Sequence, residues 1–394
     1  MVDRIKVLIV EDSPTVAQIL AKLLENDPQL QVVGVATDGT QAIRYVARFL
    51  PHVITMDVNM PHMGGLEATE YVMAHYPTPI LVLTASLAKQ DIDLSFKMLA
   101  AGALEIIEKP HADGWGRESQ RLVERIKLLS RIKVITHIRG KSRSLADFAL
   151  NPTKARLSAD EVLRFEPRRP NPSDVVTAPL DPGKIYKPPT APAFTHSEVV
   201  ALRTRNLQLV GIAASTGGPP ALSKVLKPLS AKFPIPILLV QHIPVGFSKG
   251  LADWLNGETK LTVKLATEGE LALPGYAYLP PDDSHMVIGP DMRLRRDKSG
   301  PRYGLRPSAD VTFESMAAAM PGKMLSVILT GMGRDGAQGM KALHEAGNYN
   351  IAQDEATSVI FGMPKSAIEL GVVDKILPIN EIPNLLRQIF GPLA

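Results

Sequence analysis

The segment KVLIVEDSP, residues 6–14, decides the fold of the first part of the chain. Its first five residues form a short apolar run that ends in two acids, which predicts a buried β-strand. Ser13 and Pro14 are typical of a helix N-cap and of the first helical position. Apolar residues then recur along one helical face, at Val16, Ile19, Leu20, Leu23 and Leu24. The segment therefore predicts a strand followed directly by a helix.

The same alternation of strand and helix patterns continues to about residue 130. Further apolar strands are predicted at 31–37, 53–57, 80–84 and 104–107. Amphipathic helical segments separate them, at 39–49, 64–75, 88–101 and 117–130. Strands that alternate with helices form a parallel sheet with helices on both faces. We therefore expect an α/β domain of the flavodoxin-like (βα)5 type.

Acidic side chains gather at the predicted strand ends of this domain. Glu11 and Asp12 follow the first strand, and Asp57 ends the third. Functional groups of an open parallel sheet collect outside the carboxyl ends of its strands. Each acid alone could simply cap a helix or end a strand. Three carboxylates in one crevice, however, favour a hard cation with oxygen ligands, such as Mg²⁺.

Four segments carry a resemblance over about residues 3–130: IVEDS (9–13), ITMDVNMPHMGG (54–65), VLTAS (82–86) and EKP (108–110). They resemble the receiver domain of two-component response regulators. The resemblance implies that Asp57 is phosphorylated by a histidine kinase. It also implies that Mg²⁺ is bound by Glu11, Asp12, Asp57 and the backbone of Asn59.

The resemblance extends to the residues that respond to the phosphate. Thr84 matches the switch hydroxyl of receivers, and Lys109 matches their conserved lysine. Many receivers carry an aromatic residue three positions before that lysine, whereas this chain carries Ile106. The sequence therefore gives no support for an aromatic rotamer switch at this position.

The middle of the chain loses the alternating pattern. Nine of the 33 prolines lie between residues 152 and 192, among basic residues and short polar runs. A long structureless loop inside one domain is uncommon, so this composition predicts a connector between domains. We expect a receiver domain at 1–136, a proline-rich basic linker at 137–205 and a catalytic domain at 206–394.

Composition excludes several classes of protein. The 394-residue chain has 45% hydrophobic and 21% charged residues, which is an ordinary globular profile. It has no cysteine, which excludes disulfides, thiolate metal sites and thiol nucleophiles. No run of residues is apolar enough for a membrane helix, and the N-terminus lacks the apolar core of a signal peptide. With a net charge of only +4, we expect a cytoplasmic protein with no nucleic-acid partner and no membrane insertion.

The strand and helix alternation resumes in the last part of the chain. Apolar strands are predicted at 207–213, 236–242, 261–267, 324–330, 349–354 and 373–377. Helices are predicted near 219–230, 247–257, 336–346 and 380–390. Short segments at 276–279, 286–289 and 292–296 suggest antiparallel hairpins. We expect a doubly wound, mostly parallel α/β domain with an antiparallel hairpin insertion.

Three of these strand ends carry groups suited to nucleophilic catalysis. Ser215 lies in a tight turn of small residues, His242 follows the second strand, and Asp335 lies in a glycine-rich loop. Each has an ordinary alternative: a phosphate-binding turn, a core histidine and a helix N-cap, respectively. Together they supply a nucleophile, a base and an orienting acid at one sheet edge. Their order along the chain differs from that of α/β-hydrolases.

Five segments in this part carry a second resemblance: GIAASTGGPPAL, VQHIPVGFS, RPSADVTFESMA, LTGMGRDGA and AQDEATSVIFGMP. They resemble the catalytic domain of protein-glutamate methylesterases, the chemotaxis response regulators that demethylate receptors. The resemblance implies Ser215 as nucleophile, His242 as general base and Asp335 as its orienting acid. It also implies an oxyanion contact from the Met332 backbone amide, a glutamine deamidase activity, and no cofactor for ester hydrolysis.

Two alternatives compete with a phosphorylation-activated esterase that acts on methyl-accepting chemoreceptors. The output domain could be a binding module with an inactive hydrolase fold, or the chain could be a DNA-binding regulator, although no recognition helix is visible. His285 remains open as well, as either a structural or a substrate-lining residue. We also expect the unphosphorylated receiver to restrain the esterase.

Overall fold

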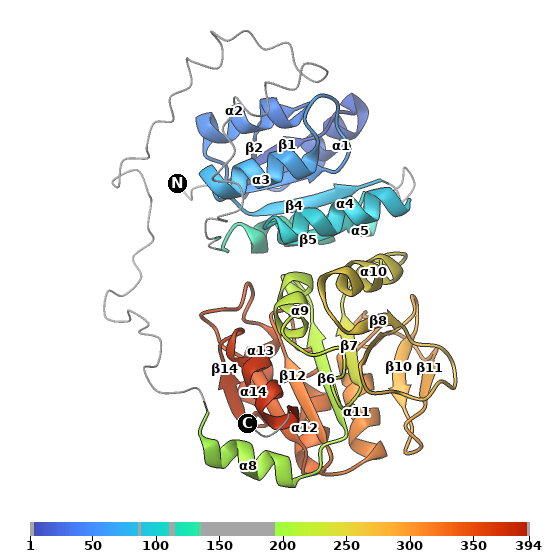
Figure 1. Cartoon of the computed structure of the whole chain (residues 1–394). Coiled ribbons are helices and arrows are strands. Elements are labelled where there is room, and N and C mark those ends of the chain that lie inside the picture. Colours follow the sequence, from blue (N-terminus) through green and yellow to red (C-terminus); the bar gives the residue numbers. More distant parts are fainter. Residues whose placement is uncertain (1–3, 86–87, 110–114, 133, 135–193, 392–394) are drawn as a thin grey trace. The chain divides into compact units, whose positions relative to one another are not determined.

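A computed structural model describes residues 4–85, 88–109, 115–132, 134 and 194–391 of the chain (Figure 1). The described residues contain two large β-sheets, and we call the part of the chain built around each sheet the first and the second unit. Most of the predicted linker, from residue 137 to residue 193, lies outside the described residues.

The first sheet contains five strands in the order β2-β1-β3-β4-β5. Its strands are β1 (Ile5–Val10), β2 (Leu30–Ala36), β3 (Val53–Asp57), β4 (Ile80–Thr84) and β5 (Glu105–Glu108). β1 pairs in parallel with β2 and β3, and β3 pairs in parallel with β4. The centre of β1 is completely buried, as its continuous apolar run predicts. The predicted parallel (βα)5 architecture is confirmed.

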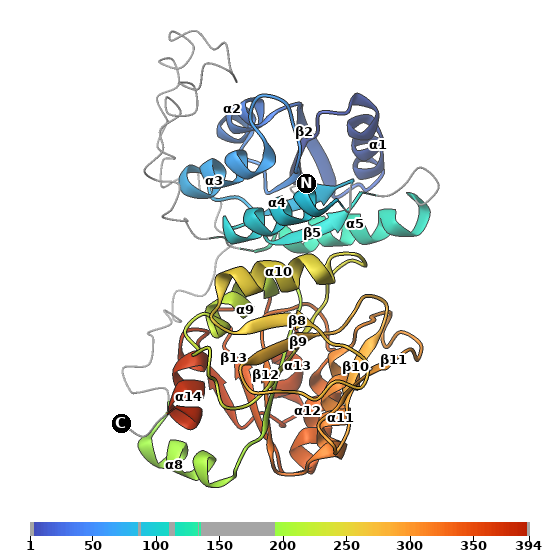
Figure 2. The same cartoon turned by 45° about the vertical axis from the view of Figure 1, so that its right-hand side comes forward.

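Helices follow the strands of this sheet: α1 (Pro14–Glu25), α2 (Gly39–Phe49), α3 (Gly65–His75), α4 (Lys89–Ala100) and α5 (Trp115–Leu129). Ser13 caps α1 as predicted, since its side chain accepts a hydrogen bond from the Val16 amide. Asp38 caps α2 in the same way. α1 lies on one side of the sheet, and α2 and α3 lie on the other (Figure 2). Each helix begins close to the carboxyl end of a strand, which leaves that edge open for functional groups.

The second sheet contains seven strands in the order β14-β13-β12-β6-β7-β9-β8. Its strands are β6 (Leu209–Ala214), β7 (Ile237–Gln241), β8 (Thr262–Leu265), β9 (Tyr276–Leu279), β12 (Met324–Ile328), β13 (Tyr349–Gln353) and β14 (Lys375–Leu377). Every pairing in this sheet is parallel. From β6 the chain builds outward through β7, and it later returns to β12 on the other side of β6. The carboxyl ends of β6 and β12 therefore flank the switch point, where α/β sheets place their ligands.

One expectation about the hairpin region needs correction. Segment 276–279 was expected in an antiparallel hairpin, but it forms β9, a parallel strand between β7 and β8. The antiparallel insertion consists of β10 (His285–Ile288) and β11 (Leu294–Asp297) alone. Short length and flanking prolines made β9 resemble its neighbours. Three of the four residues are buried in β9 and in β10 alike, so only the strand partners distinguish β9 from the hairpin.

The helices of the second unit include three that the sequence patterns did not predict. The predicted helices appear as α9 (Gly218–Leu226), α10 (Ser248–Glu258), α12 (Ala337–Glu345) and α14 (Glu381–Phe390). The additional helices are α8 (His196–Thr204), α11 (Ala309–Ala319) and α13 (Met363–Glu369). α11 packs closely on the sheet, since a Cβ atom at Gly211 of β6 would lie 2.6 Å from Met316 Sδ.

Helix α8 occupies the last part of the segment that was predicted as linker. Thr195 caps it in a capping box with Glu198. Arg203 donates hydrogen bonds to the backbone carbonyl of Gln388 in the last turn of α14, one of them at 2.8 Å, and Glu198 pairs with Lys375 at 2.7 Å. These contacts attach α8 to the second unit. The structured part of this unit therefore begins before residue 206.

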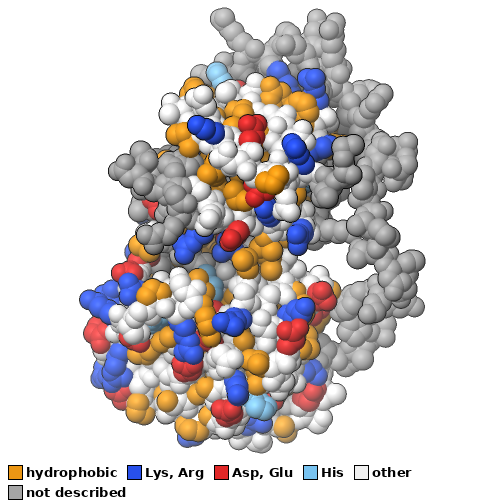
Figure 3. Space-filling model, turned by 180° about the vertical axis from the view of Figure 1, so that it is seen from behind, with side chains coloured by type: hydrophobic (Ala, Val, Ile, Leu, Met, Phe, Trp, Pro, Cys, Tyr) orange, Lys and Arg blue, Asp and Glu red, His pale blue; other side chains and the backbone are white. Residues whose placement is uncertain are grey.

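The described surface carries charges of both signs. On the face drawn in Figure 3, basic and acidic side chains are interspersed over the described residues. This mixture agrees with the small net charge of +4. Among the described helices, none combines the length and the apolar character that crossing a membrane requires.

Candidate functional sites

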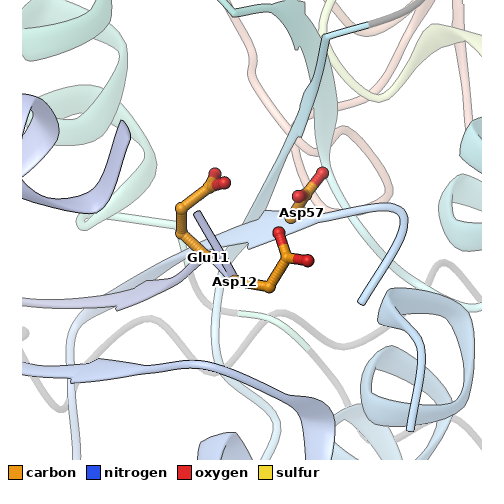
Figure 4. Close-up of side chains that lie close together, drawn as sticks. All are labelled: Glu11, Asp12 and Asp57. Atoms are coloured by element: carbon orange, nitrogen blue, oxygen red, sulfur yellow. The ribbon is translucent and has the colours of Figure 1, made fainter. Parts of the chain in front are cut away.

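The first candidate site is the cluster of carboxylates at the edge of the five-stranded sheet. Each of Glu11, Asp12 and Asp57 offers an oxygen atom, and these atoms lie within 4.8 Å of one another (Figure 4). Glu11 and Asp57 are buried, and Asp12 is exposed. β1 and β3 are adjacent in register, which brings the acids after β1 beside Asp57 at the end of β3. The sequence prediction that these three acids meet is borne out by the geometry.

The other predicted receiver residues follow neighbouring strands. Asn59 lies two residues beyond Asp57 and is exposed, whereas Thr84 and Lys109 are buried. The Lys109 amide donates a 2.7 Å hydrogen bond to the Thr84 carbonyl, which holds these two strand ends together. Ile106 is buried as well, in the middle of β5.

The donor set of the cluster fits Mg²⁺. Its ligands are all carboxylate oxygens, which are hard donors, and there are few enough of them for the ion to keep several waters. Like charges at this spacing repel one another, so a divalent cation would neutralise the cluster. Glu11, Asp12 and Asp57 are therefore the described side chains that could hold such an ion.

The second candidate site begins with the loop that carries Ser215, directly after β6. Gly217 ends the turn at φ 75°, and a Cβ atom there would lie 2.6 Å from the Val359 Cβ. The Ser215 amide donates to the Thr330 carbonyl at 3.0 Å, which attaches this loop to the end of β12. Glycine is required at 217 because both the positive φ and the close neighbour exclude a side chain. The loop is therefore rigidly placed.

His242 follows β7, the neighbouring strand. Its amide donates to the Ala214 carbonyl at 3.1 Å, next to Ser215. The buried Gln241 side chain strengthens this arrangement, because its Nε2 donates to the carbonyls of Ser215 at 2.9 Å and of His242 at 2.7 Å. Gln241 thus braces the nucleophile and base loops against each other. Sequence reasoning missed this residue, although it lies inside the VQHIPVGFS segment.

Asp335 is the most heavily hydrogen-bonded carboxylate of the second unit's candidate site. Its Oδ2 lies 2.7 Å from His242 Nε2 and accepts from the Ala309 amide at 2.6 Å. Its Oδ1 accepts from the Ser308 hydroxyl at 2.6 Å and from the Asp310 amide at 3.2 Å. The alternative role as N-cap of α12 is not realised, because Gly336 occupies that position. Asp335 instead lies at the N-terminus of α11, where the helix dipole favours a negative charge.

The hydrogen bonds to Asp335 control its charge. Burial by itself raises the pKa of this carboxyl, but the hydrogen bonds from His242, Ser308 and Ala309 outweigh burial and hold the pKa below its usual value. Its neighbour Asp310 behaves in the opposite way, since burial raises the pKa of Asp310 to about 6. Asp335 is therefore suited to remain ionised beside an imidazole.

Because Nε2 of His242 is bonded to Asp335, Nδ1 is the ring nitrogen that remains for a bond to Ser215 or to substrate. Within the described residues, the Ser215 hydroxyl makes no hydrogen bond to His242. Such bonds are often long before substrate binds. Ser215 is 6% exposed and Asp335 only 1%, so the acid is enclosed behind the histidine.

The loop of residues 331–336 borders Ser215. A Cβ atom at Gly331 would lie 2.8 Å from the Ser215 Cβ, so the glycine allows the two loops to touch. Met332 follows, with a side chain that is 37% exposed. The predicted oxyanion residue therefore directly follows the glycine that touches the loop of the predicted nucleophile. His285 is completely buried in β10, which excludes a solvent-exposed lining position for it.

Comparisons with known proteins identify the family that each part of the chain matches. Residues 7–119 match the family described as "Response regulator receiver domain", and residues 210–386 match "CheB methylesterase". The chain is 38% identical to "Protein-glutamate methylesterase/protein-glutamine glutaminase 4" of Myxococcus xanthus, over 98% of each chain. It is 37% identical to "Protein-glutamate methylesterase/protein-glutamine glutaminase 1" of Syntrophus aciditrophicus, over 99% of each chain.

A solved structure is also similar in sequence to part of this chain. The CheB methylesterase catalytic domain of Thermotoga maritima is 42% identical, with a TM-score of 0.45, and the match covers 46% of this chain and 97% of that one. The curated relatives, in contrast, match along almost the whole chain. Both units and their order thus agree with full-length relatives, and the chain belongs to the protein-glutamate methylesterase/protein-glutamine glutaminase family.

Proposed function

We propose that this protein is a phosphorylation-activated protein-glutamate methylesterase. It hydrolyses glutamyl methyl esters on chemoreceptors and deamidates glutamine side chains. The observation that carries the proposal is the 2.7 Å contact between His242 Nε2 and Asp335 Oδ2, beside the buried loop of Ser215. The names of full-length relatives support the substrate class. In this proposal the receiver domain lies within 1–136, and the catalytic domain includes α8.

The ester is attacked by the Ser215 hydroxyl oxygen. His242 accepts the hydroxyl proton at Nδ1, because its Nε2–H donates to Asp335 and so fixes the tautomer. The Met332 amide and amides near Ser215 stabilise the negative charge on the carbonyl oxygen, and one such donor is typically worth about 3 kcal/mol. The histidine then returns the proton to the leaving methanol. What remains is an acyl ester on Ser215.

Water completes the reaction. His242 Nδ1 takes a proton from water, the resulting hydroxide adds to the acyl carbonyl, and the proton returns to the Ser215 oxygen as the acyl bond breaks. The product is a glutamate side chain. A primary amide follows the same route with ammonia as the leaving group, which accounts for deamidation of glutamine. No metal or cofactor is required for these steps.

Regulation is assigned to the first unit. Asp57 accepts a phosphoryl group from a histidine kinase, with Thr84 and Lys109 contacting the phosphate. Glu11, Asp12, Asp57 and the backbone of Asn59 would hold Mg²⁺, whose charge offsets the repulsion between carboxylate and phosphate. The 4.8 Å grouping of the three acids supports this assignment. We infer a cytoplasmic protein that works with a kinase and with methyl-accepting chemoreceptors.

Methanol release tests the proposed reaction. A synthetic peptide with one glutamyl γ-methyl ester is incubated with the purified full chain, and ammonia release is followed from the glutamine version. Ser215→Ala should abolish both reactions, while Ser223→Ala on α9 serves as the matched serine control and should retain them. Hydrolysis by Ser215→Ala at the wild-type rate would refute the mechanism. A wild-type chain that binds the peptide without hydrolysing it would favour the binding-module alternative.

A further inference from the structure

A second histidine of the catalytic unit, His285, is buried in a fixed tautomer. It opens β10 and is 0% exposed. Its Nδ1 lies 3.0 Å from the Ser308 amide, which can only donate, and its Nε2 lies 3.3 Å from the Gly300 carbonyl, which can only accept. An imidazole between such partners is neutral, with its hydrogen on Nε2. The Nδ1 lone pair is thus committed to Ser308.

Ser308 is the residue that carries the donors of Asp335. It is the N-cap of α11, and its own hydroxyl donates to Asp335 Oδ1 at 2.6 Å. The next two amides, of Ala309 and Asp310, donate to the same carboxylate. The backbone that His285 holds is therefore the backbone that surrounds Asp335. A continuous chain of hydrogen bonds runs from His285 through Ser308 and Asp335 to His242.

General packing of β10 against α11 is maintained by other groups. The Thr312 hydroxyl donates to the Met286 carbonyl at 2.7 Å, and the Ser315 hydroxyl accepts from the Ile288 amide at 3.1 Å. Both contacts lie further along the helix than Ser308. Loss of the His285 contact should therefore leave α11 in place and release only its first turn, which is the part that touches Asp335.

We propose that His285 is a positioning residue of the esterase, which acts through Ser308 to hold Asp335 in line with His242. The inference rests on the proposed function, because its kinetic readout is ester hydrolysis. Groups that orient a catalytic side chain through one intermediate residue typically affect rate more than binding, and a small displacement of the reacting groups costs up to about 100-fold. His285 itself touches neither substrate nor His242.

Asparagine and leucine provide a matched pair of substitutions at this position. They have nearly the same size, but only the Asn Oδ1 can accept from the Ser308 amide in place of Nδ1. We expect His285→Leu to lower kcat on the methyl-ester peptide about 30-fold with little change in KM. His285→Asn should stay within about threefold of wild type. Equal losses in the two variants, or full kcat in a folded His285→Leu, would overturn the proposal.

A double-mutant cycle tests whether the effect passes through Ser308. In a Ser308→Ala background the hydroxyl donor to Asp335 is missing but the Ala309 and Asp310 amides remain, so His285→Leu should cost clearly less than the loss of about 30-fold expected in the wild-type background. Fully additive losses would show that His285 does not act through the Ser308 hydroxyl. If His285→Leu fails to fold, the His285→Asn and Ser308→Ala variants still give opposite expected results, with kcat retained in the first and lowered in the second.

A spectroscopic readout separates this proposal from the proposed function. With ¹⁵N-labelled histidine, the His242 Nε2–H that faces Asp335 should give a downfield proton signal in the wild-type full chain. The signal should persist in His285→Asn and shift or broaden in His285→Leu. Absence of esterase activity in the wild type would refute the proposed function alone. An unchanged His242 signal in a folded His285→Leu would refute the positioning role alone.

Discussion

Asp57 and Asp335 occupy corresponding places, at the carboxyl ends of parallel strands, but in surroundings of opposite kind. One oxygen of Asp57 lies within 4.8 Å of an oxygen of each of two other carboxylates, and Asp57 Oδ1 accepts a hydrogen bond from the Val58 amide at 2.7 Å. Asp335 accepts hydrogen bonds from three groups at the start of α11 and contacts His242 at 2.7 Å. One site concentrates negative charge, and the other surrounds a single negative charge with donors.

The difference explains how one chain can contain both a switch and a catalyst. A cluster of like charges is sensitive to whatever neutralises it, so ion binding and phosphorylation change its energy strongly. A carboxylate with all of its lone pairs occupied is preorganised and does not rearrange during the reaction. The same Asp→Asn substitution should therefore have opposite consequences in the two units.

The largest effect is expected for Asp335→Asn. Four donors face this side chain, and the Asn oxygen can accept from only about two of them. His242 then loses its fixed tautomer, and kcat for ester hydrolysis should fall about 1,000-fold. Two buried donors left unsatisfied should also lower the Tm of the catalytic unit by more than about 5 °C. Steady-state kinetics and calorimetry measure the two effects.

The matched control for Asp335→Asn is Asp291→Asn. Asp291 is exposed and pairs with Arg295 on the surface. Loss of an exposed pair costs little, so this variant should keep both the wild-type kcat and the wild-type Tm. If Asp335→Asn behaved like Asp291→Asn, the donor shell around Asp335 would have no role in the reaction.

The sequence predicted the fold well wherever local patterns decide it. The apolar run of β1, the cap at Ser13 and the strand–helix alternation all reflect local burial and capping, and they appear as predicted. Helix α11 was missed, since its apolar residues are mixed small and large ones that are buried on several sides. The prediction placed segment 276–279 in an antiparallel hairpin, whereas it pairs in parallel with β7, because strand partners depend on contacts that are distant along the chain.

The same difference between local sequence patterns and contacts that are distant along the chain applies to the residues of the candidate sites. Ser215, His242 and Asp335 were identified because each lies at a strand end beside glycines or after an apolar run. Gln241 and Ser308 were missed, because their importance comes from hydrogen bonds to residues 26 and 27 positions away along the chain. His285 was noticed but remained open between two roles. Only the structure shows that it is enclosed and bonded to the Ser308 amide.

The second-largest effect should appear at Asp310, the carboxyl beside Asp335 that lacks such a donor shell. Burial raises its pKa from the usual value of 3.8 to about 6. Folding therefore favours the protonated form, so the contribution of Asp310 to stability is complete below about pH 4 and is lost as the pH rises through about 6. Asp310→Asn removes this penalty, which is on the order of 2–3 kcal/mol at pH 8.

Thermal unfolding of Asp310→Asn and wild type at two pH values checks this expectation. The variant should gain several degrees relative to wild type at pH 8, and the gain should shrink at pH 4.5. The Asn oxygen can still accept from the Gly339 amide, which bonds Asp310 Oδ1 at 2.7 Å in the wild type. A difference in Tm that does not change with pH would contradict the assigned burial of charge.

A smaller effect is expected for regulation through Asp57. A phosphodonor such as acetyl phosphate with Mg²⁺ should label the wild-type chain and raise demethylation of receptor membranes about tenfold, which corresponds to about 1.4 kcal/mol. Asp57→Asn should accept no label and show no activation. Asp38→Asn, a helix cap in the same unit, is the control and should be labelled normally. Equal labelling of Asp57→Asn would place the phosphate elsewhere.

The smallest effect concerns the stability of the carboxylate cluster itself. In EDTA, Asp57→Asn removes one of three mutually repelling charges, so the receiver unit should gain about 1 kcal/mol, or about 4 °C in Tm. Millimolar Mg²⁺ should stabilise the wild type by binding only the folded cluster, and it should stabilise the variant much less, because one anionic ligand is gone. The difference in Tm between the variant and the wild type should therefore disappear or change sign when Mg²⁺ is added. Calorimetry of both full-length proteins, with and without Mg²⁺, measures this difference under the two conditions. A variant less stable than wild type in EDTA would mean that the groups that hold Asp57, which include the Val58 amide at 2.7 Å, outweigh the repulsion within the cluster, and the contrast between the two sites would fail.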